Sequence, residues 1–133
     1  MSEISEYLSD NILDHVLRDE EYTPPTDLYL ALYDGDPLGE GENEGTEVDS
    51  DTTNYAREII TFSPATNKEV QNGADVDFPE ATGENWGDIT HIAVFDSATG
   101  GEILFAGALD NPRTVYEGDV LRFQADEIQI ILD

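Results

Sequence analysis

The periodicity of the apolar residues changes near position 27, and this change limits the folds that the chain can adopt. From Asp27 to Tyr33 the sequence alternates, with Leu28, Leu30 and Leu32 on one face and Tyr29, Ala31 and Tyr33 on the other. Alternation with a period of two indicates a β-strand, and two apolar faces indicate a strand that is covered on both sides.

Further segments have the composition of short strands and are separated by turn sequences. They are Glu58 to Phe62, Asp75 to Phe78, Ile89 to Asp96, Ile103 to Leu109, Val120 to Gln124 and Ile128 to Leu132. Ser97-Ala98-Thr99-Gly100-Gly101 predicts a hairpin because glycine tolerates positive φ, and Glu117-Gly118-Asp119 predicts a second turn. The pattern favours a mainly β fold, an antiparallel β-sandwich (jelly-roll-like) with one N-terminal amphipathic helix at an edge or end.

That helix is predicted over residues 3–18, where apolar residues recur at spacings of three and four. The stripe consists of Ile4, Tyr7, Leu8, Ile12, Leu13, Val16 and Leu17. Ser2 or Ser5 could cap the helix, and Thr23-Pro24-Pro25 prevents its continuation. Because an isolated helix of this length is marginal in water, the stripe must lie on its own sheet or on a neighbouring subunit.

We expect a single domain over residues 1–133, with the helix at 3–18, the β-sandwich at 27–133 and a long acidic loop at 34–53. Within that loop, Leu38 and Val48 are the only large aliphatic residues, and glycines alternate with acids. A loop of this length in a compact domain is either mobile or ordered by a partner.

The charge indicates the medium in which the protein works. The chain has 31 Asp and Glu against 5 Lys and Arg, a formal charge of -26, and Lys68 is its only lysine. At about 1 M salt the Debye length is about 3 Å, so the carboxylates would repel one another little. With 38% hydrophobic residues, including six Tyr and five Phe, the chain is expected to fold rather than stay disordered. We therefore expect adaptation to molar salt.

The same composition excludes several classes of function. Phosphate binding rests on Lys and Arg, so nucleic acid is not an expected partner. The chain has no cysteine, which excludes thiolate metal sites and thiol nucleophiles. No apolar run approaches the length of a membrane span, and the N-terminus lacks the features of a signal peptide, so a soluble protein made in the cytoplasm is expected.

The acidic residues contain only weak candidates for a metal site, Asp34, Asp36, Asp49 and Asp51. Asp34 and Asp36 begin like a calcium loop, but Leu38 and Gly45 break the pattern, and Asp49 and Asp51 repeat only its alternation. We therefore expect no cofactor and at most weakly or non-specifically bound cations.

No catalytic set is predicted either. His91 and His15 have no matching partner and are expected to be hydrogen-bonded structural residues, with His91 on the face of Ile89, Ala93 and Phe95 if its strand is regular. No nucleophile elbow or phosphate loop occurs. A pair of catalytic carboxylates is uninformative in so acidic a chain, and Trp86 and the tyrosines could stack on a sugar but belong by default to a core or subunit interface.

Several strings carry a resemblance over nearly the whole chain. They are Leu28-Tyr29-Leu30-Ala31-Leu32-Tyr33, Tyr55-Ala56-Arg57, Trp86-Gly87-Asp88-Ile89-Thr90-His91-Ile92-Ala93-Val94-Phe95-Asp96 and Gly100-Gly101-Glu102-Ile103-Leu104-Phe105-Ala106-Gly107-Ala108-Leu109. In these the chain resembles small virion proteins of tailed phages and haloarchaeal tailed viruses that carry tail-fibre or head-decoration labels. The resemblance implies structural turns and core strands and brings no catalytic residue.

Together these observations predict a non-enzymatic structural protein on the exterior of a haloarchaeal tailed virus, a capsid decoration or turret subunit assembled in the host cytoplasm at high salt. A tail or fibre component is the nearest alternative, followed by a glycan-binding module and then a carbohydrate-active enzyme. The expected partners are further copies of the chain and virion proteins such as the major capsid protein or tail proteins. The predicted interface residues are Leu8, Leu13, Tyr29, Tyr33, Tyr55 and Trp86.

Overall fold

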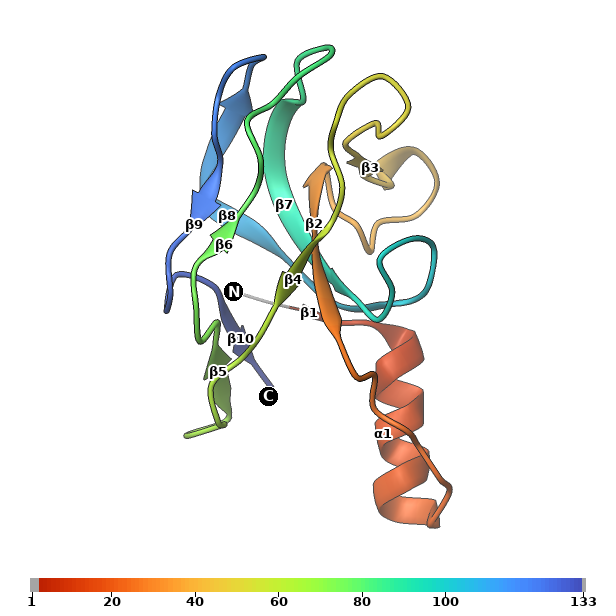
Figure 1. Cartoon of the computed structure of the whole chain (residues 1–133). Coiled ribbons are helices and arrows are strands. Elements are labelled where there is room, and N and C mark those ends of the chain that lie inside the picture. Colours follow the sequence, from red (N-terminus) through yellow and green to blue (C-terminus); the bar gives the residue numbers. More distant parts are fainter. Residues whose placement is uncertain (1–2, 133) are drawn as a thin grey trace.

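The computed structural model describes residues 3–132 as two layers of antiparallel strands with one helix (Figure 1). The large sheet has the order β1 (Glu3–Ile4), β8 (Ile103–Val115), β7 (Gly87–Phe95), β2 (Leu28–Asp34) and β3 (Thr46–Glu47), and β4 (Glu58–Ile60) also pairs with β2. Opposite it lie two short pairs, β5 (Glu69–Gln71) with β10 (Gln129–Ile131) and β6 (Val76–Asp77) with β9 (Arg122–Phe123). The prediction of a mainly β, antiparallel fold with one helix near the N-terminus is confirmed.

The main core fills the space between the layers. Leu30, Leu32 and Val94 extend from the large sheet, while Phe78 and Phe123 extend toward them from the second layer. Aromatic rings form the centre of this core: Phe78 meets Trp86 edge-on at 6.1 Å and Phe123 edge-on at 6.5 Å between ring centroids. Such edge-to-face pairs add to the stabilisation from burial alone.

A smaller apolar cluster covers the other face of the large sheet. Ala31, Tyr33, Ala93, Phe95 and Ala106 are its buried members. Strand β2 therefore contributes to both clusters, which explains its two apolar faces in the sequence. The expectation that it is covered on both sides is confirmed from Leu30 to Tyr33, where every residue is buried.

Strand β7 is not regular, and its irregularity changes which residues share a face. Between Ile89 and His91 the partner on β8 jumps from Arg113 to Ala108, which marks a bulge. Ile89 consequently packs in the main core, whereas Ala93 and Phe95 pack in the second cluster. The expectation that His91 shares a face with all three was wrong at Ile89, because the bulge reverses the alternation.

Helix α1 (Glu6–Arg18) begins later than the predicted range of 3–18. Glu3 and Ile4 instead form β1 on the border of β8. The extended backbone of Ser5 separates the two elements, and its hydroxyl accepts a hydrogen bond from the Leu8 N–H at 3.1 Å. Ser5 is thus the N-cap, as one of the two predicted alternatives had it.

The segment 34–53 has more structure than the predicted long exposed loop. It contains a 3-10 turn (Gly41–Asn43) and β3, and Val48 is buried in the main core. The carbonyl of Asp36 accepts hydrogen bonds from the N–H groups of Gly39 and Gly45 at 3.0 and 2.8 Å. The described chain itself therefore orders this segment at both ends.

Both predicted turns are present. Gly100 and Gly101 take positive φ of 60° and 74° between β7 and β8, and Gly118 has a φ of 94° in the second turn. The sequence reasoning missed β1, β3 and β5. The last of these follows a tight turn in which Asn67 and Lys68 both have positive φ.

A buried asparagine joins the second layer to the chain end. Asn72 is 0% exposed, and its Nδ2 donates hydrogen bonds to the carbonyls of Ala74 at 2.9 Å and Gln124 at 2.8 Å. Its Oδ1 accepts one from the Ile128 N–H at 2.8 Å. One amide thus fixes two loops, and all its strong hydrogen-bonding groups are used.

Candidate functional site

Within residues 3–132, no three His, Asp or Glu side chains converge in a way that could hold a metal ion. Of the weak candidates, Asp36 accepts a hydrogen bond from the Leu38 N–H and Asp49 accepts one from the Asp51 N–H. Each side chain therefore stabilises its own turn. Asp34 and Asp51 are exposed, and weak cation binding at these residues stays a prediction.

Both histidines have hydrogen-bond partners, as expected. His91 Nδ1 lies 2.8 Å from the Thr90 hydroxyl, and His15 Nδ1 lies 2.8 Å from the Glu20 carbonyl oxygen. Thr90 in turn accepts a hydrogen bond from the Gly35 N–H at 2.8 Å, which attaches the bulge of β7 to the end of β2.

Arg57 makes several polar contacts and lies in one of the strings that carry the resemblance. Its guanidinium forms a bidentate ion pair with Glu47, with N–O distances of 2.9 and 3.0 Å. It also donates to the carbonyls of Ser97 and Gly100, and its Cζ lies 3.5 Å from the centre of the Phe95 ring. This one side chain therefore ties β3 to the turn between β7 and β8.

Tyr55, from the same string, reaches the same carboxylate. Its hydroxyl donates to Glu47 at 2.6 Å and accepts from the Leu32 N–H at 3.1 Å. Burial, and then the hydrogen bond to Glu47, raise the pKa of Tyr55. Burial, followed by the charge of Glu47, raises the pKa of Tyr33 to about 12.

Burial opposes the charge of Arg57, but its hydrogen bonds and attraction to Glu47 outweigh this, and its pKa is raised. Every donor of this cluster thus stays protonated at neutral pH. The cluster is structural, and the scarcity of arginine in so acidic a chain was the sequence feature that could have revealed it.

The predicted interface residues separate into two groups. Trp86 is 6% exposed, and Tyr55, Tyr33 and Leu8 are also buried inside the chain. Trp86 Nε1 donates to Asn54 Oδ1 at 3.1 Å, so even its polar atom is engaged. As the chain is folded here, these four side chains are buried within the chain, where the three aromatic rings contribute most of the apolar area. Their part in an interface stays a prediction.

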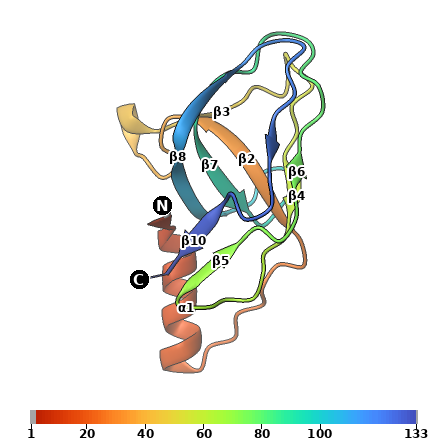
Figure 2. The ribbon, with the colours of Figure 1, turned by 90° about the vertical axis from the view of Figure 1, so that its left-hand side faces the viewer.

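Leu13 and Tyr29 make up the second group. Tyr29 is half-buried beside the second cluster, and Leu13 is 54% exposed. Leu13 lies on α1 with Val16 and with Leu17, which is 74% exposed, and among the described residues no element covers this part of the stripe. Figure 2 shows that α1 extends beyond the strands at that end of the molecule. The stripe was expected to lie on its own sheet or on a neighbouring subunit. Within the described chain Leu8 is buried and Ile4 and Ile12 are half-buried, and packing of the exposed part on another subunit stays a prediction.

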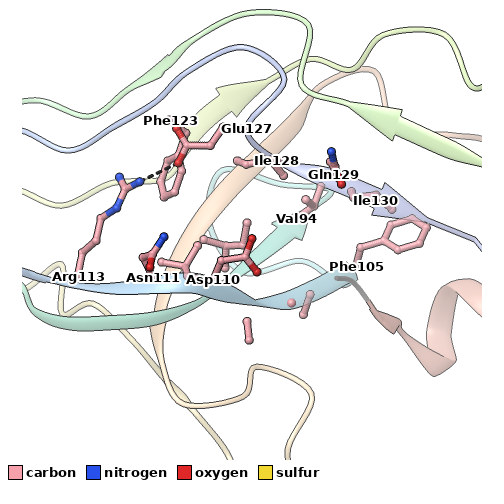
Figure 3. Close-up of a pocket in the computed structure, with 15 residues that line it drawn as sticks. Val94, Phe105, Asp110, Asn111, Arg113, Phe123, Glu127, Ile128, Gln129 and Ile130 are labelled. Carbon is pink, nitrogen blue, oxygen red and sulfur yellow. Dashed lines mark hydrogen bonds and ion pairs between the residues drawn. The ribbon is translucent and has the colours of Figure 1, made fainter.

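Besides the exposed part of α1, the molecule has a groove between the layers (Figure 3). Its volume is about 240 Å³. Strand β8 forms one wall, and the segment from Glu127 to Ile130 forms the other. Its lining is mixed, with Val94, Phe105 and Ile130 beside the polar residues Asp110, Asn111 and Gln129. At one end Arg113 forms an ion pair with Glu127 at 2.7 Å.

No helix in the described part of the chain has both the length and the apolar character needed to cross a membrane. A comparison with curated proteins gave no match. A comparison with protein families matched residues 3–131 to the family described as podophage GP4 fiber I protein gp80. The match spans both layers, α1 and the groove, and so the chain belongs to the podophage GP4 fiber I protein (gp80) family.

Proposed function

We propose that the chain is a non-enzymatic structural subunit of a tail fibre in a tailed virus. The observation that carries this proposal is the family match over residues 3–131, whose description names a fibre protein. The sequence analysis favoured a capsid decoration or turret subunit, with a tail or fibre component as the nearest alternative. The family match favours the fibre. The absence of a converged acid and histidine set in residues 3–132 is consistent with a structural role.

The second part of the proposal is a high-salt host, and a haloarchaeal one in particular. Its support is the charge of -26 with a single lysine, because such a surface would repel itself in dilute buffer. The acids lie mainly in exposed positions of the described chain, where salt can screen them.

Labelling of intact particles tests the location. Gold-conjugated antibodies raised against the whole chain should decorate the fibres of particles purified in molar salt. Labelling that covers the shell would instead establish a capsid decoration protein, and particles that carry no copies by mass spectrometry would overturn a virion role.

A glycan-hydrolysis assay at high salt, on polysaccharide from host cells, tests the non-enzymatic part. Turnover that is abolished by one carboxylate substitution, in a variant that still enters particles, would contradict it.

A further inference from the structure

Asn72 is followed by Gly73, and this is the only Asn-Gly pair in the sequence. Asparagine is one of the chemically labile residues of proteins. In an unfolded chain the main-chain nitrogen of the next residue can attack the side-chain amide carbon, and a side chain on that next residue hinders the attack. Glycine has no side chain, whereas each of the other six asparagines is followed by a residue that has one. Asn72 is therefore the asparagine of this chain that is most prone to deamidation once the chain unfolds.

The reaction is a loss of ammonia followed by an uptake of water. The bond that forms joins the Gly73 nitrogen to Cγ of Asn72, and the bond that breaks is the one from Cγ to Nδ2. The proton of the Gly73 N–H leaves with the Nδ2 group as ammonia, and a five-membered imide remains. Water then opens the imide, which gives aspartate if the new bond is cleaved and isoaspartate if the original main-chain bond is cleaved. Solvent water is the only co-reactant, and no group is oxidised or reduced.

The fold holds the side chain that would react. Asn72 is 0% exposed, and its Nδ2 and Oδ1 form the hydrogen bonds to Ala74, Gln124 and Ile128 described above. Attack requires the amide to turn toward the next main-chain nitrogen, which would break these hydrogen bonds. Breaking buried hydrogen bonds without replacing them is costly. The amide is therefore not free to turn while the chain is folded.

The main chain on both sides of this amide is held as well. The Asn72 N–H donates to the Ile128 carbonyl at 3.1 Å, and the Asn72 carbonyl accepts from the Asp126 N–H at 2.9 Å. The Gly73 N–H, whose nitrogen would attack, donates to the Thr61 carbonyl at 2.9 Å. Gly73 itself is exposed. The protection therefore comes from these hydrogen bonds and from the burial of Asn72, and solvent is not kept away from the glycine.

Neither product of the reaction fits the site. Aspartate lacks the Nδ2 donor, so the carbonyls of Ala74 and Gln124 lose their hydrogen bonds from it. Isoaspartate lengthens the main chain by one methylene group at the residue that forms an antiparallel bridge with Phe62. The residues that follow would then lose their register with the neighbouring segments. A chain modified in either way should refold poorly, and chemical modification of the unfolded state makes unfolding irreversible.

The fold does not require glycine at position 73. The φ of Gly73 is not positive, and a Cβ added there would meet no atom beyond its chain neighbours nearer than the Ser63 nitrogen, at 3.7 Å. Alanine would therefore fit without strain. The chemistry can thus be separated from the structure, because Gly73→Ala should slow the reaction and keep the fold.

We propose that the Asn72-Gly73 pair is a deamidation site that the native fold keeps closed. A copy of the chain that stays unfolded is permanently modified there and does not return to the native state. The inference rests on the sequence of the pair, the buried amide and the hydrogen bonds around it. It does not depend on where the chain lies in a particle.

The experiment compares folded and unfolded protein. The full chain is kept in molar salt and mildly alkaline buffer, with or without guanidinium chloride, and Asn72 is followed by peptide mass spectrometry. In the unfolded samples Asn72 should gain the mass that separates a hydroxyl from an amino group. In the folded samples the same change should be slower by about tenfold or more, because it requires the site to open. Equal rates in the two sets of samples would overturn the proposal.

Two variants test the cause of the reaction and of the protection. Gly73→Ala should slow the modification of Asn72 in guanidinium chloride by about tenfold or more, because the added methyl group hinders the attack. Lys68→Gly is the matched control, since it creates a second Asn-Gly pair in an exposed turn where residue 68 already has a φ of 67°. In this folded variant Asn67 should react while Asn72 stays intact. If the folded variant modifies Asn67 no faster than Asn72, burial and hydrogen bonding are not what protect Asn72, and the proposal fails.

Refolding tests the consequence. After increasing times in guanidinium chloride the wild type is returned to molar salt. The fraction that regains its native circular dichroism should fall in step with the fraction modified at Asn72, and Gly73→Ala should keep its ability to refold over the same times. Full refolding of the modified wild type, or an equal loss in Gly73→Ala, would contradict irreversible unfolding through Asn72.

Discussion

Replacing Asn72 with aspartate changes the chemistry of a buried site while keeping its shape. The present amide donates to two carbonyls, of Ala74 and Gln124, and accepts from the Ile128 N–H. In Asn72→Asp the donated hydrogen bonds are lost, and a carboxylate oxygen faces carbonyl oxygens in a site that is 0% exposed. The acceptor bond to Ile128 is kept.

The cost follows from this count. A buried carbonyl left without its donor costs about 1–3 kcal/mol, and here two carbonyls are affected. The Gln124 carbonyl keeps a hydrogen bond from the Glu127 N–H, and Ala74 is exposed. The free-energy cost at each carbonyl is therefore expected near the lower end of that range. We expect Asn72→Asp to lower the free energy of unfolding by about 3 kcal/mol at neutral pH, a large share of an ordinary stability of about 5–15 kcal/mol.

The loss should depend on pH. Burial and the facing carbonyls would raise the pKa of the new carboxyl in the folded state above its unfolded value. The variant is then closest to the wild type below the unfolded pKa of about 3.9, and it loses stability as pH rises through the raised folded pKa.

Urea unfolding in high salt at several pH values provides the measurement. Asn67→Asp is the matched control, because it adds the same charge at an exposed turn position. If Asn72→Asp unfolds at the same urea concentration as Asn67→Asp at neutral pH, the amide does not hold these loops and the reasoning fails.

Four further expectations follow from the same structure. Circular dichroism should show folded protein in about 2 M KCl and loss of structure in dilute buffer, because screening removes the mutual repulsion of the acids; an unchanged melt in dilute buffer would contradict salt adaptation. Leu8→Asp should unfold the domain or sharply lower its Tm, whereas Leu13→Asp should leave the Tm nearly unchanged, since Leu8 is 6% and Leu13 54% exposed; equal effects would show that α1 packs differently. Trp86→Ala should cost about 3–5 kcal/mol in chemical unfolding through the cavity it leaves, and Tyr116→Ala, at an exposed ring, is its control. Burial, and then Asp77, raise the pKa of Glu58, so its charged form opposes folding; Glu58→Gln should raise the Tm at neutral pH and lose this advantage near about pH 4, and a pH-independent effect would contradict it.

Long strands and glycine turns could be predicted from the sequence, and short pairings could not. β2 and β7 contain enough consecutive apolar residues for the alternation of their side chains to be recognised in the sequence. Gly100 and Gly101 indicate the turn after β7. Strands β1 and β3 have two residues each, which is too short for any periodicity. They exist because a neighbouring strand supplies their hydrogen bonds.

The candidate surfaces could be predicted less well, for two physical reasons. The sequence indicates that large aromatic side chains are buried, but only the fold shows whether Trp86 packs in the core of its own chain or against another subunit. The groove is lined by β8 and by the segment from Glu127 to Ile130, and no local sequence pattern shows that these two segments face each other.

The helix lies between two strands of one sheet that are not neighbours. β1 pairs with β8 and β2 pairs with β7, so α1 and the segment that returns from it connect one border of the sheet to its middle. Both ends of this connection are held by hydrogen-bonded strands, while its far end has few neighbours in the described chain. Substitutions at exposed positions of α1 and of the segment that follows it would therefore leave the two layers undisturbed. Proteins that share these layers could therefore gain new binding partners through sequence changes in this one connection between β1 and β2.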